Sequence, residues 1–76
     1  MDEPIWEGPV GRNFTMRVMP IGDNMHRGVL ELWRNSNNTL AYQKEVTVNR
    51  ELEGGANQTT LLEWQKVVSY WLRNFS

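Results

Sequence analysis

Hydrophobic and polar residues alternate along three stretches of the chain, residues 13–19, 28–34 and 39–48. A period of two is typical of β-strands that bury one face. The apolar phase of the first and third stretches consists of Phe14, Met16 and Val18, then Leu40, Tyr42, Val46 and Val48. Turn-forming residues fill the two gaps, with Gly22-Asp23-Asn24 in the first and Asn35-Ser36-Asn37-Asn38 in the second. The pattern therefore predicts three consecutive antiparallel strands.

After a break at Gly54-Gly55, the pattern becomes that of an amphipathic helix. At about 100° per residue, one arc collects the apolar side chains Leu61, Trp64, Val67, Val68, Trp71, Leu72 and Phe75. The opposite arc collects Glu63, Lys66, Ser69, Arg73 and Asn74. Thr60-Leu-Leu-Glu63 matches a capping box, so we expect the helix to begin there. An aromatic stripe at helical spacing predicts core packing rather than a cofactor site.

Three strands followed by one helix predict an α+β fold, a three-stranded antiparallel β-meander with the helix packed on one face (βββα). Residues 1–12 contain Pro4, Gly8, Pro9 and Gly11, which exclude a helix and a central strand there. We therefore divide the chain into an N-terminal tail or edge segment, residues 1–12, and a single βββα domain, residues 13–76.

The middle strand is apolar on both phases, because Val29 and Trp33 alternate with Leu30 and Leu32. In the meander this strand lies in the centre, so both of its faces require a cover. The pair that faces the helix depends on whether the following loop has an odd or an even number of residues, since a shift of one residue exchanges the two faces.

An odd loop, residues 36–38, pairs Leu32 with Tyr42, Gly28 with Val46 and Trp33 with Ala41. An even loop pairs Trp33 with Leu40 and turns the two leucines away from the helix. We favour the odd loop because it gathers the larger apolar set under the helix. It places Lys44 on the helix face, where the lysine stem can lie at the sheet margin or a bulge can turn it outward.

In the favoured register the face opposite the helix has an apolar centre with charged surroundings. A tryptophan and arginines surrounded by polar residues are typical of interface hot spots. The candidate partner-binding residues are Arg17, Met19, Arg27, Val29, Glu31 and Trp33. Two alternatives remain open: Ile5 and Trp6 of the tail fold back over Val29 and Trp33, or Trp33 is exposed without consequence.

The chain has 76 residues and no cysteine, so no disulfide can stabilise it. A chain this short buries only about 60% of its unfolded surface. Chains of this size often gain stability from a metal or from association. We therefore expect self-association, in the simplest case a homodimer.

Residues for catalysis or metal binding are sparse. His26 is the one histidine and has Asp23 nearby, which is too few ligands for a metal site. Ser36, His26 and Asp23 lack the context of a nucleophile elbow, and no glycine-rich phosphate loop is present. Glu51 and Glu53 lie in a polar linker, where a solvated pair is expected. The sequence predicts a protein that is not an enzyme and has no cofactor and no metal.

The favoured function is a small protein-interaction module that self-associates. Its size and lack of catalytic groups are typical of accessory proteins, such as viral or phage products that bind and modulate a host protein. The alternative is a nucleic-acid-binding module that uses the arginines and Trp33 of the sheet face. A net charge of −1 argues against it, as do Glu31 and Glu45, which share that face with Arg17 and Arg27.

A second alternative is a secreted glycoprotein domain. Asn13, Asn37, Asn57 and Asn74 each begin an Asn-x-Ser/Thr glycosylation pattern. The start MDEPIWEGPVG is acidic and broken by prolines and glycines, unlike a secretory signal. No apolar run approaches the roughly 18 residues of a membrane span. We therefore expect a cytoplasmic protein with no membrane contact.

Overall fold

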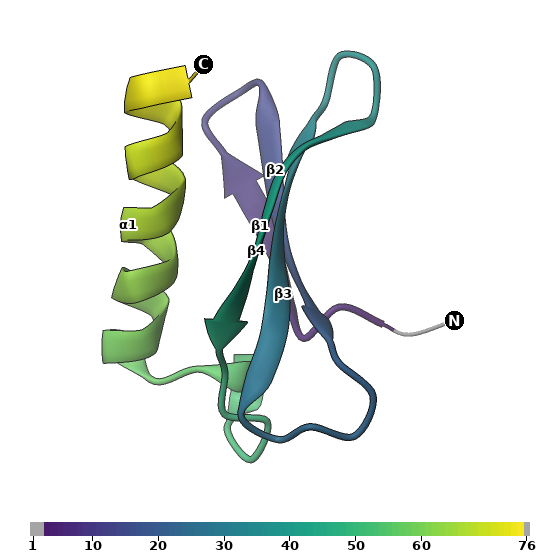
Figure 1. The fold of residues 1–76 in the computed structure, drawn as a ribbon, viewed down its shortest axis with the longest axis vertical. Coiled ribbons are helices and arrows are strands. Elements are labelled where there is room, and N and C mark those ends of the chain that lie inside the picture. The colour runs from purple at the N-terminus through teal and green to yellow at the C-terminus, as the bar shows by residue number, and fades with distance from the viewer. Residues whose placement is uncertain (1–2, 76) are drawn as a thin grey trace.

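The computed structural model describes residues 3–75 and shows one antiparallel sheet with a helix on one of its faces (Figure 1). The strands are β1 (Trp6–Val10), β2 (Phe14–Pro20), β3 (Arg27–Arg34) and β4 (Thr39–Thr47), and they lie in the order β1-β2-β3-β4. A short 3-10 turn, η1 (Glu53–Gly55), leads to the helix α1 (Gln58–Phe75). The α+β class, the antiparallel sheet and the C-terminal helix are confirmed. The strand number is wrong, because the sheet has four strands rather than three.

The additional strand is β1, which forms one edge of the sheet. It pairs with β2 through Trp6–Val18, Gly8–Met16 and Val10–Phe14, with Pro9 between the last two pairs. Proline is tolerated at a sheet edge because no further strand needs its missing N–H. A β-carbon at Gly8 would lie 2.6 Å from the Trp6 ring, so the glycine makes room for the indole.

The core lies between the sheet and α1. The buried apolar side chains are those of Met16, Val18, Leu30, Leu32, Val46, Val48, Trp64, Val68 and Trp71. Trp64 meets the Trp6 ring edge-on at 6.3 Å, and Trp71 stacks on Tyr42 at 5.9 Å. The predicted apolar arc of the helix thus faces the sheet. Phe75 departs from this, because it lies in the last helical turn and is 66% exposed.

The register between β3 and β4 contains a bulge. From Gly28–Val46 to Leu32–Tyr42 the pairing is that of the odd loop, but Trp33 pairs with Leu40 rather than with Ala41. The loop itself has four residues, 35–38. Ala41 is the extra residue that reconciles an even loop with the odd register. The favoured pairing is therefore confirmed for most of the strand and wrong at its loop end.

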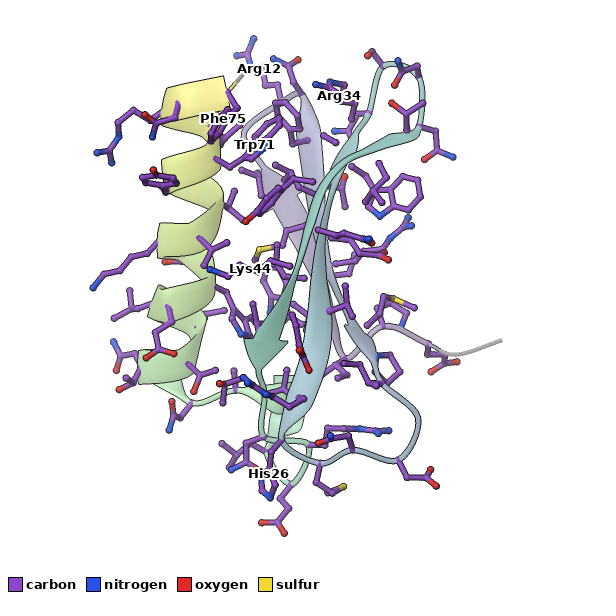
Figure 2. The ribbon with its side chains drawn as sticks, in the orientation of Figure 1. Arg12, His26, Arg34, Lys44, Trp71 and Phe75 are labelled. Carbon is purple, nitrogen blue, oxygen red and sulfur yellow. The ribbon has the colours of Figure 1, made fainter. Side chains whose placement is uncertain are left out.

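Lys44 pairs with Leu30 and so belongs to the helix face, as expected from the odd register. Its side chain is exposed, and Figure 2 shows it extending from β4 toward α1. Because β4 is the last strand, this position is the margin of the sheet. A long aliphatic stem can lie there while the ammonium group remains in water.

The helix begins three residues earlier than the capping box predicts. Asn57 precedes the first helical residue, and its Oδ1 accepts a hydrogen bond from the Thr60 backbone N–H at 2.8 Å. The Thr60 hydroxyl donates to the same oxygen at 2.9 Å. Asn57 is thus the N-cap and Thr60 is the third helical residue, so the predicted cap at Thr60 is wrong. Asparagine is as good an N-cap as serine or threonine, and Asn57 accepts a hydrogen bond from a backbone N–H of the first turn that has no partner within the helix.

Candidate interaction surface

The sheet has one covered face and one open face. For residues 3–75, Figure 1 shows α1 on one side and no second layer on the other. Residues on the side opposite α1 follow from the strand registers, because successive side chains alternate across a sheet. We call this the open face; it comprises Glu7, Pro9, Thr15, Arg17, Met19, Arg27, Val29, Glu31, Trp33, Leu40, Gln43, Glu45 and Thr47.

Cross-strand pairing arranges the open face in rows. One row is apolar apart from a threonine and runs Pro9, Thr15, Trp33, Leu40. The next is charged and runs Glu7, Arg17, Glu31, Gln43. The third contains Met19, Val29 and Glu45, and the last contains Arg27 and Thr47. Neighbours within a row interact directly, so the charged row separates two apolar patches.

Trp33 is held in place by the charged row. The Arg17 guanidinium carbon lies 5.5 Å from the centroid of the Trp33 ring, within cation–π range. Arg17 also forms an ion pair with Glu7 on β1. The Trp33 indole N–H donates to Glu31 Oε1 at 3.0 Å. The ion pair contributes little stability by itself, but together these contacts restrain the ring.

The structure brings the six candidate residues together on β2 and β3. Met19 pairs with Val29 and Arg17 pairs with Glu31. Trp33 is half-buried and lies in the row beside Arg17 and Glu31. Arg27 is the most peripheral of the six, at the end of β3, and lies 3.9 Å from Glu45 and 3.3 Å from the Thr47 hydroxyl.

The tail does not cover this face. Trp6 pairs with Val18 and packs against Trp64, which places it on the helix side. Ile5 packs against the same core, and its backbone N–H donates to Val18 O at 2.7 Å. The tail-cover alternative is therefore wrong. The cause is that β1 pairs in register with β2, so that its apolar phase joins the apolar phase of β2.

Sequence reasoning missed three residues of the open face, Glu7, Pro9 and Leu40. The first two could have been found, because Trp6, Gly8 and Val10 alternate with Glu7 and Pro9 as in a strand. Leu40 reaches the open face only through the bulge at Ala41, which no local pattern indicates.

Residues outside the open face offer little further chemistry. His26 is exposed in the loop before β3, and its backbone N–H donates to Asn24 Oδ1 at 2.9 Å. Within residues 3–75 no cluster of three or more histidine or acidic side chains could hold a metal ion. In the same part of the chain, no helix is long and apolar enough to cross a membrane. The glycosylation-pattern residues Asn13, Asn37, Asn57 and Asn74 are all exposed.

Comparison with protein-family models, with curated proteins and with solved structures finds no match to this chain.

Proposed function

We propose that this chain is a protein-interaction module, binding rather than catalytic, that associates with a second copy of itself through the open face. The observation that carries the proposal is Trp33, which is half-buried and held by Arg17 and Glu31 on a sheet face without a covering layer. Tryptophan and arginine dominate binding energy at interfaces, particularly when they are ordered before binding.

The charge pattern of the open face favours a second copy as the partner. Its charged row contains both signs, with Arg17 between Glu7 and Glu31. In a two-fold dimer the same patch meets itself, so a row of mixed sign can place an arginine of one copy against a carboxylate of the other. The apolar patches on either side, around Trp33 and around Met19 and Val29, would then be buried as in a β-sandwich.

The nucleic-acid alternative receives less support. The two arginines of the open face, Arg17 and Arg27, each lie beside a carboxylate, Glu7 and Glu45 respectively. A phosphate backbone would have to displace these carboxylates and overcome the repulsion of Glu31. The net charge of −1 provides no general attraction for a polyanion.

Sedimentation equilibrium of Trp33→Glu tests the proposal. The substitution puts a charge at the centre of the proposed interface, so we expect the mass to shift from dimer toward monomer, with dissociation at least about tenfold easier for a buried unpaired charge. Tyr70→Glu is the matched control, because Tyr70 is an aromatic residue of α1 that is 63% exposed. Its mass should equal that of the parent protein.

A folded Trp33→Glu variant with the mass of the parent protein contradicts the proposal. So does a parent protein that remains monomeric at millimolar concentration. Far-ultraviolet circular dichroism establishes that both variants are folded.

A further inference from the structure

The two edges of the sheet present different hydrogen-bonding groups. Asn35 N–H donates to Asn13 O at 2.9 Å, so this pair is hydrogen-bonded across β2 and β3. Because such pairs alternate along an antiparallel ladder, the even-numbered residues of β2 bond to β1 through Trp6, Gly8 and Val10. Glu7 and Pro9 then direct their backbone groups outward, and proline has no N–H. The β1 edge therefore lacks one of its two outward donors, the one at Pro9.

The β4 edge, unlike the β1 edge, keeps its outward backbone N–H groups. Val48 N–H donates to His26 O at 2.9 Å, which makes this pair hydrogen-bonded. The alternation then directs the backbone groups of Gln43, Glu45 and Thr47 away from β3. The Thr47 carbonyl does point away from β3, because its oxygen accepts a hydrogen bond from the Trp64 indole of α1 at 2.8 Å. Gln43 and Glu45 are left with outward donors and acceptors, on a strand without proline.

A groove lies beside the open part of this edge, between β4 and α1. It has a volume of about 370 Å³ and is lined by Tyr42, Lys44, Lys66, Val67 and Tyr70. Figure 2 shows the Lys44 side chain reaching into the space between the two elements. The ion pairs within residues 3–75 involve Arg17 and Arg27 but neither lysine. The groove thus combines two uncompensated positive charges with aromatic and aliphatic surface.

We propose that the β4 edge binds an extended segment of another protein, which adds to the sheet as a fifth strand antiparallel to β4. Backbone groups of Gln43 and Glu45 supply the main-chain hydrogen bonds, as in other strand-addition complexes. The groove selects an acidic side chain opposite Lys44 and an apolar one opposite Tyr42. A second apolar residue lies opposite Val46, beyond the groove. Specificity then comes from alternate side chains of the bound segment.

A second copy of this chain is a poor occupant of the edge. Two-fold pairing centred on Lys44 places that residue directly opposite its copy, and pairing centred on Glu45 does the same with two carboxylates. Pairing centred on Gln43 avoids both, but it leaves Lys44 opposite Tyr42 and Glu45 opposite Ala41, so neither charge meets an opposite one. Like charges directly opposite one another destabilise a strand pair. The edge therefore favours a different chain, and this interaction is separate from the dimer proposed for the open face.

The test uses the peptide acetyl-Thr-Val-Lys-Glu-Thr-Val-Thr-amide, titrated into the ¹⁵N-labelled full chain. Aligned antiparallel to β4, its glutamate lies opposite Lys44, its lysine opposite Glu45 and its valines opposite Val46 and Tyr42. We expect saturable shifts of the Gln43 and Glu45 amides and of residues 66–70. The matched control exchanges the lysine and the glutamate, which reverses two cross-strand charge pairs, and should bind at least about fivefold more weakly.

Two further comparisons test the hydrogen-bond alternation. N-methylation of the peptide lysine removes an N–H that bonds to Glu45 and should abolish binding, whereas N-methylation of its glutamate alters an N–H that faces water. In the protein, Lys44→Glu should reverse the preference between the two peptides, with folding checked by circular dichroism.

Several results overturn the proposal. They are no saturable shift at millimolar peptide, shifts confined to β1, β2 and β3, equal binding of the two peptides, and equal effects of the two methylations. Concentration-dependent shifts of the Gln43 and Glu45 amides without peptide that persist in Trp33→Glu, in which the open-face dimer is disrupted, would assign this edge to self-pairing instead.

Discussion

Deletion of a single residue tests the role of the bulge between β3 and β4. In this bulge, Leu40 and Ala41 together lie opposite Trp33 of β3. Deleting Ala41 would make the ladder regular. Trp33 would still pair with Leu40, Leu32 would still pair with Tyr42, and every later pair would be unchanged. We therefore expect the variant to keep its fold, with a change in unfolding free energy within about 1 kcal/mol.

Deletion of Gln43 is the matched control, since it removes one residue from the same strand. A regular ladder would then keep Lys44 opposite Leu30 and preserve the pairs beyond, but it would move Tyr42 to the open face. Tyr42 stacks on Trp71 with ring centroids 5.9 Å apart, and this contact would be lost. An aromatic pair contributes about 0.5–1.5 kcal/mol beyond burial, and the partial burial of the ring adds about 1 kcal/mol. We expect this deletion to cost about 2 kcal/mol.

Urea titration followed by tryptophan fluorescence measures both deletions, and near-ultraviolet circular dichroism reports on the Tyr42–Trp71 pair. For a chain of this size, 2 kcal/mol corresponds to a decrease in melting temperature of about 8–16 °C. The reasoning is refuted if deletion of Ala41 costs as much as deletion of Gln43, or if the Gln43 deletion leaves the near-ultraviolet spectrum unchanged.

Two substitutions with matched controls test the core and the linker, both by urea unfolding at concentrations where the protein is monomeric. Trp64→Phe should lower the unfolding free energy by about 2–3 kcal/mol, because a side chain only 1% exposed loses a hydrogen bond and leaves a cavity. The control Trp33→Phe, at a half-buried position, should lower it by under about 1 kcal/mol. Equal losses of unfolding free energy contradict the assigned core. Gly55→Ala should lower the unfolding free energy by about 2–3 kcal/mol, since its φ is +73° and a β-carbon would lie 2.0 Å from Ile5 Cγ2. The control Gly11→Ala, at φ +63° with no atom within 4 Å, should lower it by about 1 kcal/mol. A smaller loss at Gly55 than at Gly11 contradicts the close packing of Ile5.

The helix was the most predictable element, because its pattern is long and periodic. Trp64, Val68 and Trp71 are buried, and Glu63, Lys66 and Ser69 on the opposite arc are exposed. Its start was less predictable, because Asn57 and Thr60 are both acceptable caps.

The strand β1 was not predicted, because its sequence pattern is short and weak. β1 has five residues and contains Gly8 and Pro9, both of which weaken a strand signal. What stabilises it is tertiary, namely the contact of the Trp6 ring with Trp64 on α1. A residue 58 positions away in sequence cannot be inferred from a local pattern.

The candidate surface was identified through the alternation of β2 and β3 alone. Arg17, Met19, Val29, Glu31 and Trp33 share a face because a period of two holds within each strand. The arrangement of that face was not predictable, because the Arg17–Trp33 and Arg17–Glu7 contacts depend on side-chain rotamers and on β1. Nor was the openness of the β4 edge, since hydrogen-bond alternation requires the actual register.

Pro9 has a consequence for growth of the sheet. Fibrous β-assemblies propagate when each added molecule presents at one edge the template it has just used at the other. In this chain the free edge of β4 would meet, on the next molecule, a β1 strand in which Pro9 supplies no outward N–H. Each step of edge-to-edge growth would therefore form one hydrogen bond fewer than a regular ladder, which disfavours growth of a fibre from this sheet.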